Sequence, residues 1–135
     1  MVQEVERKYF EDGKIASEIY YKDGKYHRED GAAIIEYHKN GQIKRMEYYK
    51  EGKYFRENAP AFILYYDNGQ VEREEYYKDG KYHREDGPAI IEYHKDGQVK
   101  REEYYINNKH LNYREWLKET LGKTIQSQIE EELEL

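Results

Sequence analysis

The sequence predicts a mainly β protein: an elongated, twisted antiparallel meander of stacked β-hairpins that ends in a short C-terminal helical cap. Three observations lead to this fold class: a 28-residue repeat, turn dipeptides at regular intervals, and 17 tyrosines in 135 residues. Tyrosine buries a large ring while its hydroxyl stays in water. A chain rich in tyrosine can therefore form a sheet too thin to have a dry interior.

The repeat is clear when the chain is aligned on its tyrosine pairs. Residues 20–47 read "YYKDGKYHREDGAAIIEYHKNGQIKRME", and residues 48–75 and 76–103 follow the same pattern without insertion or deletion. Partial repeats begin at Lys8 and at Tyr104. Repeats of fixed period indicate an array in which each unit packs mainly on its neighbours. We expect residues 1–112 to form this array and residues 113–135 to form a helical cap and an acidic tail.

Turn dipeptides separate the expected strands at intervals that alternate between 11 and 17 residues. They are Asp12-Gly13, Asp23-Gly24, Asn40-Gly41, Glu51-Gly52, Asn68-Gly69, Asp79-Gly80, Asp96-Gly97 and Asn107-Asn108. Such pairs tolerate positive φ angles, so each predicts a two-residue β-hairpin turn. The longer interval holds a second break, "REDGAA" in the first repeat, where Gly31 and its equivalent Gly87 are expected to adopt conformations that other residues avoid.

Two-residue turns fix a register that can be checked against charge. This register places four glutamates opposite arginines, which stabilises antiparallel strands. The pairs are Glu36–Arg45, Glu47–Arg56, Glu75–Arg84 and Glu92–Arg101. It also pairs aromatic rings on one face (Tyr21–Tyr26, Tyr49–Tyr54, Tyr77–Tyr82) and on the other (Tyr20–His27, Tyr48–Phe55, Tyr76–His83). Neither face of the predicted sheet is apolar throughout, so the alternation of apolar and polar residues along the strands does not identify the buried face.

The segment "NYREWLKETLG" predicts the cap. Asn112 and Glu115 have the spacing of a capping box, Trp116 and Leu117 begin an apolar helical pattern, and Gly122 is expected to end the helix. Beyond it, Ile125, Ile129 and Leu133 recur every four residues. This second segment is compatible with a short acidic helix or with a frayed end.

Composition restricts the classes of function. The chain has 39% charged residues and a net charge of -6, with no basic excess that would predict general affinity for nucleic acid or anionic membranes. It has no cysteine, so disulfides and thiolate metal sites are excluded. There is no apolar signal region at the start and no apolar run of membrane-spanning length. We expect a soluble cytoplasmic protein without a membrane partner.

The stretches "GKYHREDGPAIIEYHKDGQVKREEYY" and "NGQVEREEYYKDGK" resemble the bacterial MORN-variant repeat family. The resemblance covers residues 8–121 and implies stacked β-hairpins in an elongated, twisted sheet. It also implies a short C-terminal helix, and some members of the family are described as antitoxin components. The middle repeat departs from the family pattern at "RENAPA", where Asn58 and Ala59 replace Asp and Gly, so the turn there is expected to differ.

The histidines suggest an enzyme or a metal site, because His27 and His38 recur as His83 and His94 with acids nearby. In the middle repeat, however, Phe55 and Tyr66 occupy the equivalent positions. Positions that accept His, Phe or Tyr predict aromatic packing. We therefore predict no catalytic, cofactor or metal site and no enzymatic activity, with a metal-dependent enzyme as a remote alternative.

A surface for a protein partner is the leading functional hypothesis, because tyrosine supplies rigid contact area at low entropy cost. The predicted contact residues are Tyr20, Tyr48, Tyr76, Tyr104, Lys22, Lys50, Lys53 and Lys78. The partner could be an effector that this protein inhibits, as an antitoxin or a phage anti-defence or anti-CRISPR protein does. The alternative is single-stranded nucleic acid, which lysines and stacked rings can bind, although Glu18, Glu72, Glu74 and Glu102 on the same face would repel phosphate. The oligomeric state stays open.

Overall fold

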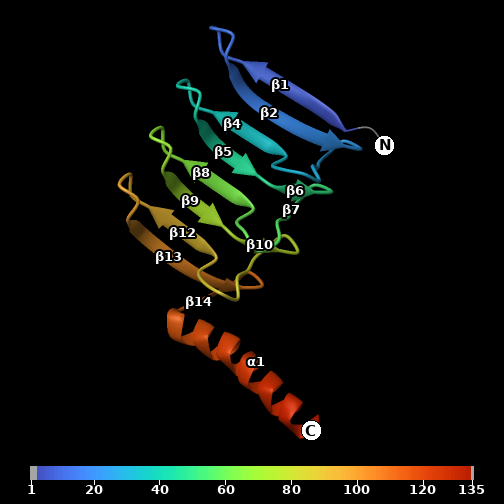
Figure 1. Cartoon of the computed structure of the whole chain (residues 1–135), viewed down its shortest axis with the longest axis vertical. Coiled ribbons are helices and arrows are strands. Elements are labelled where there is room, and N and C mark those ends of the chain that lie inside the picture. The colour runs from blue at the N-terminus through green and yellow to red at the C-terminus, as the bar shows by residue number, and fades with distance from the viewer. Residues whose placement is uncertain (1–2, 135) are drawn as a thin grey trace.

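A computed structural model describes residues 3–134 and consists of a β-strand array followed by one helix (Figure 1). The elements are β1 (Glu4–Tyr9), β2 (Ile15–Lys22), β3 (Lys25–Tyr26), β4 (Ile34–Tyr37), β5 (Ile43–Glu47), β6 (Tyr49–Lys50), β7 (Lys53–Tyr54), β8 (Phe62–Tyr65), β9 (Val71–Glu75), β10 (Tyr77–Lys78), β11 (Lys81–Tyr82), β12 (Ile90–Tyr93), β13 (Val99–Ile106), β14 (Lys109–Leu111) and α1 (Tyr113–Glu134).

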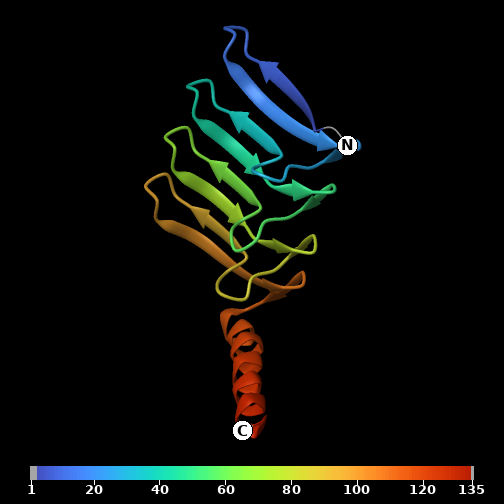
Figure 2. The ribbon, with the colours of Figure 1, turned by 45° about the vertical axis from the view of Figure 1, so that its right-hand side comes forward.

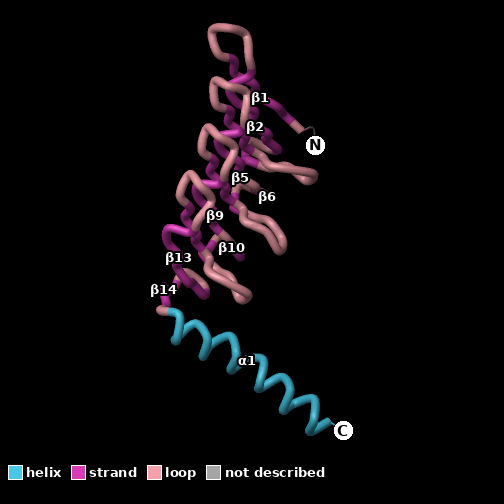
Figure 3. Tube along the Cα trace, turned by 60° about the vertical axis from the view of Figure 1, so that its left-hand side comes forward, coloured by secondary structure: helices cyan, strands magenta, loops and turns pink. Residues whose placement is uncertain are grey.

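The strands form an antiparallel meander, which confirms the predicted fold class. The main sheet has the order β1-β2-β4-β5-β8-β9-β12-β13-β14, so successive strands are neighbours. The short hairpins β6–β7 and β10–β11 form separate two-stranded sheets. Figure 2 and Figure 3 show these hairpins projecting from one side of the main sheet as a second row. The predicted single ribbon is therefore incomplete, because each repeat contributes strands to two rows.

The bend between the rows falls at Tyr48 and Tyr76, one residue after β5 and β9 end. Tyr48 N–H donates to Ala61 C=O at 2.7 Å, and Tyr76 N–H donates to Ala89 C=O at 2.7 Å. These are the last backbone hydrogen bonds that each long segment makes before the short hairpin begins. The following two residues then pair within their own hairpin, so the chain leaves the sheet at a fixed point.

The turns are of two kinds, and the prediction is correct for one of them. In Asp23-Gly24, Glu51-Gly52, Asp79-Gly80 and Asn107-Asn108 both residues have positive φ, as type I′ turns require. In the other four, only the glycine does. There the loop has three residues, because His38 N–H donates to Gln42 C=O at 2.8 Å across it. A bulge in the following strand then restores the expected register.

The charged pairs test this register. Glu36–Arg45 and Glu92–Arg101 lie opposite each other and form ion pairs of 2.7 and 2.9 Å, as predicted. Glu47–Arg56 and Glu75–Arg84 are wrong, because the strand bends directly after each glutamate. Glu47 and Glu75 instead pair with Arg45 and Arg73 on their own strands, at 3.1 and 2.5 Å. The pairs Tyr21–Tyr26, Tyr49–Tyr54 and Tyr77–Tyr82 are confirmed.

The core is thin and repeats with the chain. Ala33, Ala61 and Ala89 are each 0% exposed at the second break of their repeats. Ala33 N–H donates to Glu47 C=O at 2.8 Å while its carbonyl accepts from Tyr20 N–H at 2.7 Å, so the break continues the backbone hydrogen bonding. A larger side chain at these positions would have to displace packed neighbours.

The glycines of the second break do not have the expected role, because neither has positive φ. A Cβ on Gly31 would lie 3.2 Å from Arg28 Cζ, and one on Gly87 would lie 2.9 Å from Arg84 Cζ. Both glycines make room for a folded-back guanidinium. In the middle repeat the turn differs, as expected, since Asn58 adopts a φ of 55°.

The capping box is confirmed, because Glu115 N–H donates to Asn112 Oδ1 at 2.9 Å and Asn112 N–H donates to Glu115 Oε1 at 3.1 Å. Trp116 packs with Ile106 and Leu111 in a small terminal core. The predicted stop at Gly122 is wrong. The two predicted segments form one helix of 22 residues that extends beyond the array (Figure 1). A single glycine costs a helix only about 1 kcal/mol, which its neighbours can offset.

Candidate binding surfaces

Tyr20, Tyr48 and Tyr76 lie one repeat apart, and each is half-buried beneath an arginine. The guanidinium carbons of Arg28, Arg56 and Arg84 lie 3.8, 3.9 and 3.9 Å from the respective ring centroids. Each arginine also donates to a backbone carbonyl four residues later, at 3.1 to 3.2 Å. These cation–π contacts cover one face of each ring. At these three repeats the row presents guanidinium groups outward.

The fourth tyrosine of the predicted row, Tyr104, lies at the helical cap. Its ring centroid is 5.3 Å from that of Tyr113 and 4.9 Å from that of Trp116. The four tyrosines therefore form one row in the repeat, but the last one belongs to the terminal packing.

The predicted lysines lie at the tips of the short hairpins. Lys22 lies opposite Lys25, Lys50 opposite Lys53, and Lys78 opposite Lys81. Like charges directly opposite each other are unfavourable in a strand pair. Only for Lys50 do the described residues include an ion pair, to Glu29 at 3.4 Å, and its amine also lies 4.6 Å from the Phe55 ring centroid. The tips thus form a line of lysine pairs with the period of the repeat.

A second aromatic surface, which we call the tyrosine ladder, runs along the short hairpins. Its rings contact one another in an unbroken series of stacked and tilted pairs, with centroid distances from 4.4 to 5.4 Å. The ladder consists of Tyr21, Tyr26, Tyr49, Tyr54, Tyr77, Tyr82, Tyr105 and His110. The sequence predicted the pairs within hairpins but not the contacts between them. The missed signal was the period itself, because identical hairpins one repeat apart place their rings side by side.

Buried carboxylates hold the ladder on the main sheet. Glu47 is 6% exposed, and its Oε1 accepts hydrogen bonds from Tyr49 and Tyr54 at 2.8 and 2.5 Å. Glu75 is 7% exposed and accepts one from Tyr77 at 2.5 Å. Burial raises the pKa of Tyr49 to about 12, and the hydrogen bond to Glu47 also raises it. Burial likewise raises the pKa values of Tyr54 and Tyr77, so these hydroxyls remain protonated donors.

The histidines join neighbouring repeats. His27 and His83 are buried, and their Nδ1 atoms accept hydrogen bonds from Glu51 N–H and Asn107 N–H at 2.9 and 3.0 Å. His38 contacts Tyr65 C=O at 3.0 Å through Nε2, whereas His94 is exposed.

The middle repeat supports the packing interpretation of these positions. Tyr66 takes the place of His38 and makes the equivalent bond, donating to Tyr93 C=O at 2.7 Å. Among the described residues, no three His, Asp or Glu side chains come together in a geometry that could hold a metal ion.

Two rows of hairpins, a constant period and a shared tyrosine ladder define a β-hairpin repeat protein. The chain belongs to the MORN repeat variant family, whose model matches residues 5–23, 33–57, 61–83 and 90–107. Comparison with curated proteins and with solved structures gave no match. Among the residues that the structure describes, no helix has both the length and the apolar character needed to cross a membrane.

Proposed function

We propose that this protein is a non-catalytic module that binds a protein partner along the tyrosine ladder and the adjoining lysine pairs. MORN repeats are typically binding modules without catalysis, and four matches to them cover most of the array. The observation that carries the proposal is the ladder, because its seven tyrosines are held by ring contacts, and Tyr49, Tyr54 and Tyr77 also by hydrogen bonds to buried glutamates. Rigid aromatic area binds proteins at low entropy cost.

The tyrosine ring faces are largely covered, which favours a protein partner over single-stranded nucleic acid. Bases bind by stacking on open aromatic faces. In the ladder the rings already contact each other, and the central ones stack, as for Tyr54 and Tyr77 at 4.4 Å. In the other row the arginines cover the rings of Tyr20, Tyr48 and Tyr76. Ring edges beside the lysine pairs therefore make up most of the aromatic surface, and these suit the mixed chemistry of a protein.

We further propose that binding inhibits an effector, in the manner of an antitoxin or a phage anti-defence protein. The family resemblance and the long, rigid shape of the array support this role, since such an array can cover an extended region of a larger protein. Co-expression with the product of a neighbouring gene tests it. Growth rescue by the wild type and not by the ladder variant is expected, and toxicity unchanged by the wild type would contradict it.

The binding proposal is tested by affinity capture from the native host with three variants of matched design. Tyr26→Ala with Tyr82→Ala changes the ladder, Tyr20→Ala with Tyr76→Ala changes the row under the arginines, and Lys25→Glu with Lys53→Glu changes the tips. Circular dichroism first confirms that each variant is folded. We expect a stoichiometric protein partner that the ladder variant loses. A partner lost only with Tyr20 and Tyr76 would move the site to the originally predicted row, and no partner for the wild type would refute the proposal.

A further inference from the structure

The three junctions between neighbouring short hairpins are not equivalent. At the first, Glu51 N–H donates to the His27 ring, Gly52 N–H donates to Tyr26 C=O at 2.9 Å, and Arg28 N–H donates to Tyr49 C=O at 3.3 Å. The last junction repeats this set: Asn107 N–H donates to the His83 ring, Asn108 N–H to Tyr82 C=O, and Arg84 N–H to Tyr105 C=O. These three hydrogen bonds join each of the two hairpin pairs, and at the last junction Tyr82 N–H adds a fourth by donating to Asn108 Oδ1 at 2.7 Å.

The middle junction, between β6–β7 and β10–β11, lacks this set. Phe55 stands where His27 and His83 stand, and a phenyl ring cannot accept a hydrogen bond from Asp79 N–H. The equivalent bonds from Gly80 to Tyr54 and from Arg56 to Tyr77 are also not formed within the described residues. The hairpins still touch through the ladder rings of Tyr54 and Tyr77. The junction is therefore closed along the ladder and open elsewhere.

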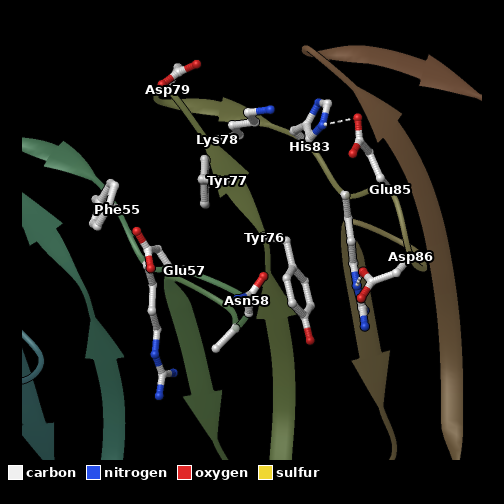
Figure 4. Close-up of a pocket in the computed structure, with 13 residues that line it drawn as sticks. Phe55, Glu57, Asn58, Tyr76, Tyr77, Lys78, Asp79, His83, Glu85 and Asp86 are labelled. Carbon is white, nitrogen blue, oxygen red and sulfur yellow. Dashed lines mark hydrogen bonds and ion pairs between the residues drawn. The ribbon is translucent and has the colours of Figure 1, made fainter. Parts of the chain in front are cut away.

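A cavity of about 640 Å³ lies at this open junction, and we call it the Phe55 hollow (Figure 4). The aromatic part of its lining is Phe55, Tyr76 and Tyr77, and the polar part includes Asn58, Lys78 and His83. Phe55 is 39% exposed, whereas His27 and His83 are 5% and 8% exposed. The middle repeat therefore exposes an apolar ring where its neighbours bury a polar one.

The charges of the lining favour an uncharged occupant. Arg84 pairs with Asp86 at 2.9 Å, and Glu85 lies 3.5 Å from His83. The remaining charged groups are two cations and two acids: Arg56, Lys78, Glu57 and Asp79. None of these four has an ion pair within the described residues. Arg28 and Arg84 pair with the aspartate two residues later, whereas Arg56 has Asn58 at that position and so lacks this ion pair.

Hydrogen-bonding groups complete the site. Asp79 lines the hollow, and its backbone N–H lacks the partner that the equivalent groups have at the other junctions. Gly80 and Tyr54 line an adjoining cavity that shares Phe55 and Asp79 with the hollow, and the Gly80 N–H and the Tyr54 carbonyl also lack the equivalent partners. His83 Nδ1 accepts from Asn107 N–H, so its Nε2 carries the proton and faces Glu85 Oε1 at 3.5 Å. An exposed ring surrounded by unused donors and acceptors suits a peptide group with an apolar side chain.

We propose that the Phe55 hollow is the anchor site for the protein partner and takes one aromatic side chain from an extended segment of it. The partner ring packs against the exposed Phe55 ring, and its peptide groups bond to the backbone groups of Asp79, Gly80 and Tyr54 that lack partners at this junction. Anchors of this kind supply much of the affinity of an interface from a small area. The inference rests on the proposed function and adds the chemistry of the contact.

The test needs no identified partner, because N-acetyl-L-tryptophanamide carries the aromatic ring and both peptide groups. Titration into the ¹⁵N-labelled full chain is expected to shift the amide signals of Arg56, Asp79 and Gly80 with a dissociation constant of about a millimolar. Phe55→His should weaken binding at least about tenfold. It should leave the thermal midpoint unchanged or raised, since it restores the acceptor for Asp79. The matched reverse variant, His27→Phe, should create a second set of shifts at Glu51 and Gly52.

Each outcome decides the inference. Shifts that are absent, that lie elsewhere, or that persist undiminished in Phe55→His overturn it. If His27→Phe unfolds, the Phe55→His comparison alone still decides, because that variant restores a residue that the other repeats tolerate. Failure of the proposed function is distinguishable: a partner captured equally by wild type and Phe55→His refutes only the anchor site, whereas absence of any captured partner refutes the proposed function.

Discussion

Replacing Glu47 by Gln tests whether buried carboxylates hold the tyrosine ladder. Glu47 Oε1 accepts from the hydroxyls of Tyr49 and Tyr54, and Oε2 lies 3.1 Å from Arg45 Nε. Hydrogen bonds to a charged group contribute about 1.5–3 kcal/mol each. Glutamine keeps one acceptor oxygen but turns its amide donor toward the Arg45 donor. The variant therefore loses the arginine contact and weakens both tyrosine bonds.

We expect Glu47→Gln to lower the free energy of unfolding by about 3 kcal/mol, roughly two such bonds. For a chain of this size that corresponds to a fall in Tm of about 10 °C. Denaturant unfolding followed by tyrosine fluorescence and by circular dichroism measures the loss. Hydrogen exchange should show it first at residues 49–54, because a repeat array distributes stability among local contacts.

The control is Glu36→Gln, which breaks the other ion pair of the same arginine. Both side chains of the Glu36–Arg45 pair are about one-third exposed. Partly exposed pairs contribute under about 1 kcal/mol. If Glu47→Gln costs no more than Glu36→Gln, the ladder is held by stacking alone and the assigned role of the buried carboxylate is wrong.

Three further predictions concern the ladder, the second break and the cap. The pKa of Tyr49 is raised in the folded chain. Its contribution to the free energy of unfolding is therefore fully present below the unfolded-state pKa of 10 and is lost as pH rises toward about 12. Tyr49→Phe should therefore reduce the alkaline loss of stability in pH-dependent melts. Gly87→Ala places a methyl group 2.9 Å from Arg84 Cζ, but Ala59 stands at the same position beside a folded-back Arg56, so we expect a loss below about 1 kcal/mol in urea unfolding, absent when combined with Arg84→Ala. Trp116→Ala removes the buried ring of the cap and should cost about 3–5 kcal/mol, with faster hydrogen exchange over residues 104–111 than over β1.

The local features of the fold could be predicted because each depends on residues close together in the chain or one period apart. Asn-Gly and Asp-Gly pairs located the turns, and the spacing of Asn112 and Glu115 located the helix start. Even the extra residue in half of the turns did not spoil the Glu36–Arg45 register, because a bulge compensates for it. The bend at Tyr48 could not be predicted, since it depends on where the next repeat offers a carbonyl.

The candidate surfaces were predictable only in part, because side-chain direction after the bend depends on tertiary contacts. The sequence paired Arg56 with Glu47, whereas the bend turns Arg56 onto the Tyr48 ring at 3.9 Å. The arginines therefore cover part of the row of Tyr20, Tyr48 and Tyr76 that the sequence predicted as contact residues. The ladder followed from the same tyrosine pairs, but its continuity requires the hairpins to stack at one repeat spacing.

In an array of near-identical units, the residues that repeat serve mainly to hold neighbouring units together. A residue that departs from the repeat can therefore indicate a role other than packing. His27 and His83 each accept a hydrogen bond at a junction between short hairpins, and Phe55 at the middle junction cannot accept one. The change also leaves an exposed ring, which is unfavourable in water. A substitution that weakens packing and exposes apolar surface has no advantage for the fold. Its location in the middle of the array, bordered by the ladder, is better explained by a contact with another protein, and this is why the Phe55 hollow is the first place to test.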